Sequence, residues 1–285
     1  MPELPEVETI KEDLKELVVG ARIDKAEILD PSLVEGPSPE EFVRRLEGRL
    51  IVDARRRGKN LVVGLDSGDA VVFQLKIGGQ LLLVPLVEVS TSALMLVLRL
   101  DGDRRLFLRD ETGFTRARVS TEEELAAWSV SLGPEPLEAE FGVEYFRGKL
   151  SSRRARIKPL ILDQEMVAGV GNIYADEALF DARIHPRRKA NTLSADEWAA
   201  LHRAIQNNLR AGIEHRGTTF SLYRDVLGRK GGHQEYLKVF LRAGEKCLGC
   251  GGKVVREKVG GRATFVCPAC QREAGLEGEQ SLLFG

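Results

Sequence analysis

The chain has 285 residues, of which 43% are hydrophobic and 30% are charged, and this balance is typical of a globular protein of about two domains. Its longest apolar runs are too short to cross a bilayer, and its acidic start lacks the features of a signal peptide, so we expect neither a membrane partner nor a signal peptide. The formal net charge of −1 excludes the uniformly basic coat that many nucleic-acid binders carry.

The residue pattern predicts one helix followed by a region of strands. Pro5 suits the opening turn of the helix, Gly20 suits its C-cap, and apolar residues recur between them at helical spacing. From about residue 21 to residue 119, short apolar runs alternate with turn residues, which favours an antiparallel sandwich or barrel. The predicted strands cover residues 51–54, 61–65, 70–75, 80–84, 93–98 and 105–108.

Helical patterns dominate the middle of the chain. A predicted helix at 122–129 and the turn-rich residues 132–136 close the region of strands. Ser194 and Glu197 have the spacing of a capping box at the start of a long helix. The predicted helices of this region cover residues 157–164, 175–182 and 195–214.

The charges are divided unevenly along the chain. Residues 143–272 carry 24 basic and 13 acidic side chains, a balance of +11, and the remaining residues have a balance of −12. Such an asymmetry fits a polyanion partner for the basic part, although a solvated surface explains the charge equally well.

The four cysteines form two CxxC pairs, with 16 residues between the pairs. This spacing is typical of a zinc ribbon, in which four thiolates surround one Zn²⁺ ion in a closed, structural site. We therefore predict that one zinc ion is bound by Cys247, Cys250, Cys267 and Cys270.

The first residues of the chain combine an amine with two carboxylates. Methionine before proline is normally removed, which would leave Pro2 with a free secondary amine that is partly unprotonated at neutral pH. Glu3 and Glu6 are spaced to lie on one face of a helix, where they can move protons for a Schiff-base reaction. The same residues are also ordinary helix-start chemistry.

Two further segments can contact phosphates. Residues 55–59 are a basic cluster that leads into a strand, and residues 167–172 are a glycine-rich turn that ends at Asn172. Taken alone, the first is also compatible with a solvated strand end and the second with an ordinary connection between helices.

Six motifs occur together in one order: MPELPEVET at the start, RRRGKNL at 55–61, LGPEPL at 132–137, LDQEMVAGVGNIYADEALF at 162–180, RGTT at 216–219 and the CxxC…CxxCQ finger. In this order, over about residues 1–271, the chain resembles the formamidopyrimidine-DNA glycosylases, whose family also includes endonuclease VIII. The LPE start is similar to the formamidopyrimidine branch.

The resemblance implies an α+β multidomain fold. It implies an N-terminal antiparallel β-sandwich with a leading helix as the catalytic domain (1–131), and a helix–two-turn–helix DNA-binding domain (132–236). A C-terminal four-cysteine zinc ribbon (237–271) and a flexible tail (272–285) complete the expected organisation.

The resemblance also implies a reaction: DNA base-excision repair by a bifunctional glycosylase and AP lyase. Pro2 would attack C1′ of a flipped oxidised purine nucleotide (formamidopyrimidine or 8-oxoguanine) and form a Schiff base, and β,δ-elimination would then cleave the strand. Glu3 matches the family's acid/base, Glu6 a supporting carboxylate, and Lys59 the lysine that approaches the lesion and its phosphate.

The partner implied by the resemblance is double-stranded damaged DNA. Asn172 and Arg262 match the pair that grips phosphates around the flipped nucleotide, and Lys158 is an additional phosphate contact. Ile77 stands where the family has Met and Phe114 is retained, so an apolar wedge survives, but Thr112 replaces the family's Arg. This loss predicts relaxed opposite-base preference.

Two departures concern lesion choice and the tail. The segment after Thr219 differs from the usual lesion-recognition sequence, which puts 8-oxoguanine specificity in doubt. Gln280, Leu283 and Phe284 in the tail are similar to the short peptides that dock on the bacterial sliding clamp, or they belong to a disordered end. We expect a monomer in the bacterial cytoplasm, at the nucleoid.

Two alternatives remain open at this point. One is endonuclease VIII-like activity on oxidised pyrimidines. The other is a non-catalytic protein that only binds damaged DNA, which would have no need of Pro2, Glu3, Glu6 and Lys59.

Overall fold

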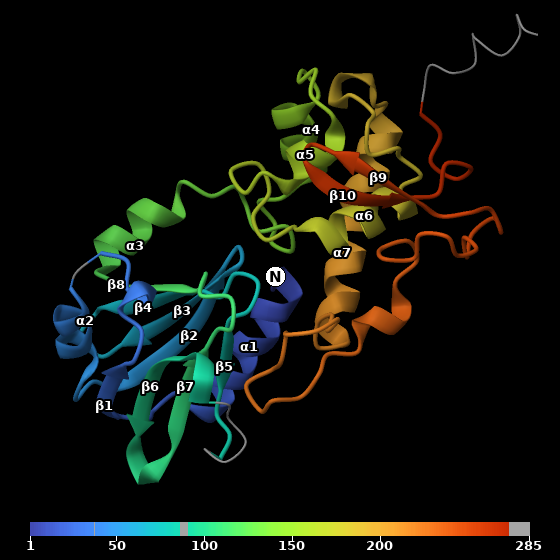
Figure 1. Ribbon diagram of the computed structural model, residues 1–285. Coiled ribbons are helices and arrows are strands. Elements are labelled where there is room, and N and C mark those ends of the chain that lie inside the picture. The colour runs from blue at the N-terminus through green and yellow to red at the C-terminus, as the bar shows by residue number, and fades with distance from the viewer. Residues whose placement is uncertain (37, 86–90, 274–285) are drawn as a thin grey trace, which may run out of the picture. The chain divides into compact units, whose positions relative to one another are not determined.

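The computed structural model describes residues 1–36, 38–85 and 91–273 (Figure 1). The chain divides into two compact units, the first made of residues 1–131 and 211–235, the second of residues 132–210 and 236–285. The predicted clamp-binding residues Gln280, Leu283 and Phe284 lie outside the described residues.

The first unit is a sandwich of two antiparallel four-stranded sheets. One sheet has the strand order β1-β6-β7-β5 and the other the order β2-β3-β4-β8. The strands of the first sheet are β1 (Ile23–Ile28), β5 (Gln80–Leu82), β6 (Leu94–Leu100) and β7 (Arg105–Arg109). Those of the second are β2 (Ile51–Arg57), β3 (Asn60–Leu65), β4 (Ala70–Gln74) and β8 (Arg116–Ser120). The predicted sandwich is confirmed, with β1 and β8 in addition to the six predicted strands.

Alternating side chains explain why the two sheets pack face to face. In β3, Leu61 and Val63 point into the central core, whereas Val62 belongs to a separate cluster on the opposite face of its sheet. Leu125 and Trp128 of α3 (Glu122–Ser129) pack on that outer face. The sheet is therefore covered on both sides, which is why β3 reads as a nearly continuous apolar run.

Helix α1 (Leu4–Leu17) contributes one of its faces to the same core. Val7, Ile10 and Leu14 are fully buried there, which confirms the helix predicted from their spacing. The helix ends at Leu17, and Gly20 follows with a φ of +89°, so the left-handed residue lies beyond the C-cap at Val18. A second helix that the pattern did not predict, α2 (Pro39–Leu46), is capped by Ser38.

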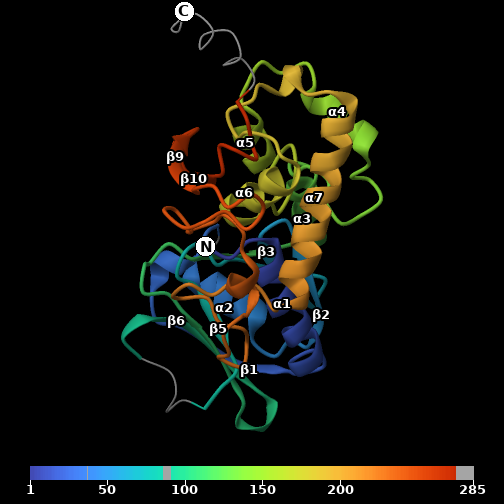
Figure 2. The same ribbon diagram turned by 90° about the vertical axis from the view of Figure 1, so that its right-hand side faces the viewer.

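The second unit is built from helices and a two-stranded hairpin. Its helices are α4 (Val143–Leu150), α5 (Ile157–Leu162), α6 (Asn172–Asp181) and most of α7 (Ala195–Glu214). The Ser194–Glu197 capping box is present at the start of α7, with both reciprocal hydrogen bonds formed. The hairpin of β9 (Val255–Val259) and β10 (Arg262–Val266) packs its second strand against α6 (Figure 2).

Residues 211–235 belong to the first unit, although the resemblance implied that they lie in the helical domain. The reason is chemical: Thr218 and Arg216 bind acidic side chains of α1, more than 200 residues earlier in the chain. The zinc-finger residues, in contrast, belong to the same compact unit as the helices.

Candidate active site and nucleic-acid interface

The start of α1 places two buried carboxylates beside Pro2. Pro2 is buried, and Glu3 and Glu6 are only 3% and 1% exposed. Glu6 Oε2 accepts a hydrogen bond from the Glu3 N–H at 2.8 Å, and Glu6 Oε1 accepts one from the Thr218 N–H at 2.7 Å. Backbone donors at a helix N-terminus stabilise such carboxylates as anions.

Gly217 is the residue that lets the 216–219 segment approach Glu6. A Cβ on Gly217 would lie 2.8 Å from Glu6 Cγ, and its φ of +81° is a conformation that favours glycine. The RGTT motif therefore has a structural meaning that the sequence analysis did not assign: Gly217 gives the close approach and Thr218 donates the N–H. In the sequence, the RGTT motif was the only sign of this contact.

The β2–β3 hairpin places Lys59 in its two-residue turn. Arg57 pairs with Asn60 across the hairpin, and Gly58 has a φ of +60° at the first turn position. Arg56 fixes the turn, since Nη1 donates to the Gly58 carbonyl at 2.9 Å and Nε donates to Glu8 of α1 at 2.7 Å. The hairpin tip is thus tied to the helix that carries Glu3 and Glu6.

The basic cluster at 55–59 is more than a solvated strand end. The Arg56 side chain is only 8% exposed and forms an ion pair with Glu8. Arg57 donates to the hydroxyl and the carbonyl of Ser129, at the end of α3. Two of its three arginines therefore hold the hairpin in place, whereas Arg55 pairs with Asp53 in solvent.

Two exposed apolar side chains stand on loops that bind each other. Ile77 lies between β4 and β5, Phe114 between β7 and β8, and they are 54% and 58% exposed. Gly78 allows the loops to touch, because a Cβ there would lie 2.2 Å from Asp110 Oδ1. Thr115 Oγ1 also donates to the Leu75 carbonyl at 3.0 Å.

Asp110 organises the second of these loops. Its carboxylate accepts hydrogen bonds from the Thr112 N–H at 2.7 Å, the Thr112 hydroxyl at 2.6 Å and the Thr115 N–H at 2.8 Å. Burial alone would raise the pKa of Asp110, but these donors outweigh it and lower the pKa. The hydroxyl of Thr112 is consequently engaged within its own loop.

In the second unit, Asn172 and Arg262 lie next to a shared backbone group. Asn172 begins α6, and its Nδ2 donates to the Ala263 carbonyl at 2.9 Å. Arg262, the residue before Ala263, is exposed at the start of β10 after the Gly260–Gly261 turn. The structure therefore brings these two predicted phosphate-binding residues together.

The position of Lys158 does not allow a direct contact with a DNA phosphate. It is fully buried, and its Nζ forms an ion pair with Asp176 at 2.7 Å. Nζ also donates to the Ala263 carbonyl at 3.1 Å and the Thr264 hydroxyl at 2.8 Å. We therefore correct the prediction: the ammonium of Lys158 holds the β9–β10 hairpin on α5 and α6.

Asp176 completes this buried contact and was missed by the sequence analysis. Its Oδ2 accepts the Phe265 N–H at 2.9 Å, while Oδ1 faces Lys158. Burial raises the pKa of Asp176 to about 7, against the opposing effect of the Lys158 ammonium. Its neighbour Glu177 accepts the N–H groups of Lys238, Val239 and Phe240, and so fixes the chain that leads to the finger.

The four cysteines meet as the CxxC spacing predicts. Their Sγ atoms all lie within 4.8 Å of one another, which fits tetrahedral thiolate coordination of one Zn²⁺ ion. The N–H groups of Gly249 and Gly252 point to Cys247 Sγ and Cys250 Sγ, each at 3.4 Å. Such donors stabilise thiolates, so the donor set suits a zinc ion.

Among the described residues, no helix is long and apolar enough to cross a membrane.

Comparison with known proteins gives three family matches along the chain. Residues 1–117 match the formamidopyrimidine-DNA glycosylase N-terminal domain, 132–224 the formamidopyrimidine-DNA glycosylase H2TH domain, and 244–272 a zinc finger found in FPG and IleRS. A formamidopyrimidine-DNA glycosylase of Roseiflexus sp. (strain RS-1) is 43% identical, with 95% of this chain and 100% of the relative covered.

Solved structures give the same result. A complex of a Lactococcus lactis FPG mutant with Fapy-dG-containing DNA has a TM-score of 0.90 at 33% identity, and covers 95% of this chain and all of that one. The wild-type L. lactis protein in complex with oxidised-pyrimidine-containing DNA has a TM-score of 0.89, with the same identity and coverage. A β-sandwich with an H2TH helical domain and a four-cysteine zinc finger defines one class of protein, and the chain belongs to the formamidopyrimidine-DNA glycosylase family.

The zinc site gives a first testable prediction. Replacing Cys267, a buried ligand, by Ala removes one of four thiolates, so the bound zinc should fall from one equivalent per chain to well below one. Metal analysis measures the content, and limited proteolysis should show new cleavage within residues 244–272. Chelation and zinc re-addition to the unmodified chain is the control. Full zinc content in Cys267→Ala would contradict the four-thiolate site.

The buried Lys158–Asp176 pair gives a second prediction. Lys158→Met leaves a buried carboxylate without its cation, which should lower the free energy of unfolding of the second unit by about 3–5 kcal/mol. Adding Asp176→Leu should restore most of it, because neither charge then remains buried. Trp198, buried in this unit, reports its unfolding by fluorescence when Trp128 is replaced by Phe. Equal stability of the single variant and the parent would show that the pair does not hold the hairpin.

Proposed function

We propose that the chain is a base-excision repair enzyme that flips an oxidised purine nucleotide out of duplex DNA, removes the base and cleaves the strand as an AP lyase. The observation that carries this proposal is the start of α1, where two buried carboxylates follow Pro2 and backbone N–H groups hold the carboxylate of Glu6. Binding of damaged DNA alone requires none of these groups.

The nucleophile is the amine of Pro2 after removal of Met1. In the structure Met1 is present and 52% exposed, so its removal requires no change in the core. The Pro2 nitrogen then attacks C1′, the bond from C1′ to the base nitrogen breaks, and the base leaves with a proton. Opening of the C1′–O4′ bond gives the iminium ion, and Glu3 supplies the proton that O4′ takes up.

Strand cleavage follows from the iminium ion. It acidifies the proton at C2′, whose loss expels the 3′-phosphate in β-elimination, and a second elimination expels the 5′-phosphate. Glu6 supports these steps by fixing Glu3, since it accepts the Glu3 N–H at 2.8 Å. Lys59 in the β2–β3 turn supplies a cation for the phosphate of the lesion nucleotide.

The DNA contacts come from both units. Asn172 and Arg262 bind phosphates beside the flipped nucleotide, and the Lys158–Asp176 pair keeps their backbone in place. Ile77 and Phe114 fill the space that the flipped base leaves, because an apolar wedge compensates for lost stacking. The zinc ion folds the finger that carries Arg262 and takes no part in the chemistry.

The lyase step gives a prediction for Pro2. Borohydride in the presence of abasic-site DNA should trap a covalent adduct of the wild-type chain on its N-terminal peptide, as found by mass spectrometry. Pro2→Glu, which retains Met1 and thus has no amine at this position, should form no adduct.

The matched control is Pro5→Ala, which alters the next proline of the same turn and keeps the Pro2 amine. This variant should be trapped at nearly the wild-type level. A well-folded wild-type chain that forms no adduct would instead establish the alternative, a protein that only binds damaged DNA.

Structures of the L. lactis protein contain two kinds of lesion: a mutant is in complex with Fapy-dG-containing DNA and the wild type with oxidised-pyrimidine-containing DNA. We propose oxidised purines as substrates. Single-turnover excision on 8-oxoguanine, formamidopyrimidine and thymine glycol duplexes tests this, and faster thymine glycol removal would favour the endonuclease VIII-like alternative.

Thr112 gives a prediction about the base opposite the lesion. Its hydroxyl donates to Asp110 at 2.6 Å, so position 112 has no guanidinium for the orphaned base and its hydroxyl proton is already bonded. We expect similar excision rates with each of the four opposite bases. Thr112→Arg should add about 1–3 kcal/mol of discrimination, whereas Thr112→Met, similar in reach but uncharged, should add none. A strong preference of the wild-type chain for cytosine would contradict this.

A further inference from the structure

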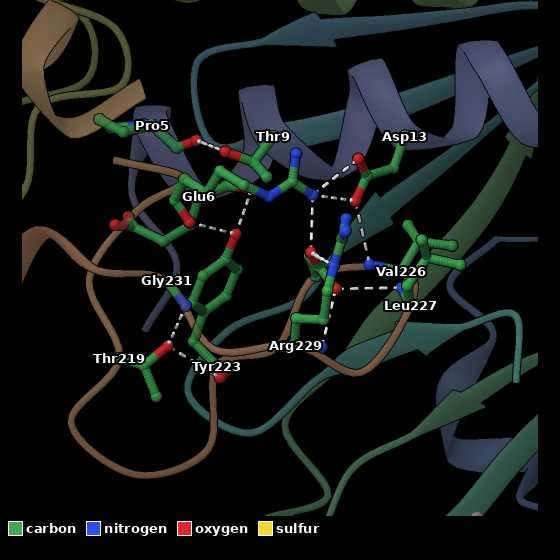
Figure 3. Close-up of polar contacts among 12 residues, drawn as sticks. Pro5, Glu6, Thr9, Asp13, Thr219, Tyr223, Val226, Leu227, Arg229 and Gly231 are labelled. Atoms are coloured by element: carbon green, nitrogen blue, oxygen red, sulfur yellow. Dashed lines mark hydrogen bonds and ion pairs between the residues drawn. The ribbon is translucent and has the colours of Figure 1, made fainter. Parts of the chain in front are cut away.

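The segment of residues 216–226 lies along one face of α1 and contacts it at two places (Figure 3). Near the start of the helix, Thr218 donates its N–H to Glu6. Farther along, Val226 donates its N–H to Asp13 Oδ2 at 3.3 Å. Glu6 and Asp13 are seven residues apart, so they lie on the same side of the helix about two turns from each other.

An ion-pair cluster anchors this segment at its Asp13 end. Arg216 Nη2 lies 2.8 and 2.7 Å from the two oxygens of Asp13 and 2.6 Å from Asp225 Oδ2. The side chains of Asp13 and Asp225 are only 8% and 2% exposed. Two buried carboxylates beside each other require cations, and Arg216 and Arg229 supply them.

Arg216 has a left-handed backbone conformation. Helix α7 ends at Glu214, and Arg216 follows with a φ of +58°. Glycine is the favoured residue in this left-handed position, and a larger residue costs about 1–2 kcal/mol. The Arg216 guanidinium forms ion pairs with two buried carboxylates, and these pairs keep the pKa of Asp225 low against the effect of burial.

Tyr223 fills the space between the two contacts with α1. Its hydroxyl donates to the Arg216 carbonyl at 3.1 Å, and burial raises its pKa, so it remains a neutral donor. Thr219 donates to the Tyr223 carbonyl at 3.1 Å and accepts the Gly231 N–H at 3.0 Å. The segment between Arg216 and Val226 is therefore tied internally as well as to α1 (Figure 3).

We propose that Arg216 is a positioning residue that acts on the reaction through Glu6. Its guanidinium holds the 216–226 segment on α1, and the segment keeps the Thr218 N–H on the Glu6 carboxylate. Glu6 in turn holds the backbone of Glu3. The inference rests on the proposed function, in which Glu3 and Glu6 serve base removal.

Loss of the Arg216 guanidinium has a specific consequence. Asp13 and Asp225 then repel each other, and the segment moves away from α1. Glu6 loses the Thr218 N–H donor, and loss of an N–H donor disfavours the charged form of a carboxylate. The phosphate-binding residues Asn172 and Arg262 belong to the other unit, so we expect their contribution to DNA affinity to be unchanged.

The experiment compares Arg216→Met, Arg216→Gly and Arg216→Lys with the wild-type chain in single-turnover excision at saturating DNA. Met and Gly should slow excision about tenfold or more and shift the acidic limb of the rate–pH profile to higher pH. Glycine adopts the left-handed conformation without strain. The Arg216→Gly variant therefore separates the effect of losing the guanidinium from the effect of backbone strain. Lys, which restores a cation, should recover part of the rate.

The matched control is Lys230→Met, which removes one positive charge from an exposed position just after the segment. It should excise at the wild-type rate. The affinity of all variants for a duplex with a tetrahydrofuran abasic analogue should stay within about threefold of wild type. Hydrogen exchange of residues 217–226 should be faster in Arg216→Met and Arg216→Gly, and unchanged in Lys230→Met.

A double-mutant cycle with Glu6→Gln decides whether Arg216 acts through Glu6. If it does, Arg216→Met should slow a Glu6→Gln chain little further. Additive losses, or weaker DNA binding at an unchanged excision rate, would overturn the inference. A wild-type chain that forms no borohydride adduct would overturn the proposed function itself, whereas an active wild type with an equally active Arg216→Met overturns only the role of Arg216.

Discussion

Buried carboxylates that accept backbone N–H groups hold three of the irregular segments that the proposed function uses. Glu6 accepts the N–H groups of Glu3 and Thr218, and Asp110 those of Thr112 and Thr115. Glu177 accepts three successive N–H groups before the zinc finger. Loops have no partner strand or helix turn to satisfy such donors, and a buried donor without an acceptor costs about as much as a lost hydrogen bond. A carboxylate can accept several of these bonds at once, so one side chain fixes a whole turn.

Because several of the charged groups are buried, the net charge of the chain does not describe the charge on its surface. Asp13, Asp225, Asp176 and Glu177 contribute to the net charge of −1, yet all four are buried and bind internal partners. Lys158 is a buried cation in the same sense, and therefore adds nothing to a phosphate-binding surface. The formal balance of +11 in residues 143–272 includes such buried groups, so it is not the charge that is exposed to DNA. Exposed groups such as Arg262 are the ones that can contact a DNA phosphate.

Local patterns were sufficient to predict the elements whose signals lie within a few residues. Helix α3 at Glu122–Ser129 and helix α7 at Ala195–Glu214 have the predicted bounds, because caps and apolar spacing are local. Strand β8 was missed since only Ala117 and Val119 face the core, and its Arg118 instead packs over the ring of Trp128. A strand with two apolar residues gives too short an alternation to recognise.

The contacts of the site show why sequence reading finds residue types more readily than their partners. The four cysteines were predicted correctly because the geometry of a CxxC knuckle is encoded within four residues. Lys158 was misjudged because its partners Asp176, Ala263 and Thr264 lie 18 to 106 residues away, and nothing local distinguishes a buried lysine from an exposed one.

Arg216 combines a locally unfavourable backbone conformation with a distant contact. After the end of a helix, a left-handed residue is ordinarily glycine, and here Gly217 follows directly with the same backbone hand. An arginine before it violates the local preference, and such violations persist when another part of the fold compensates. The compensation is the pair of buried aspartates, of which one lies on the helix that begins with the reactive residues. The ion pairs of Arg216 thus link the helix that begins with the reactive residues to a segment more than 200 residues later.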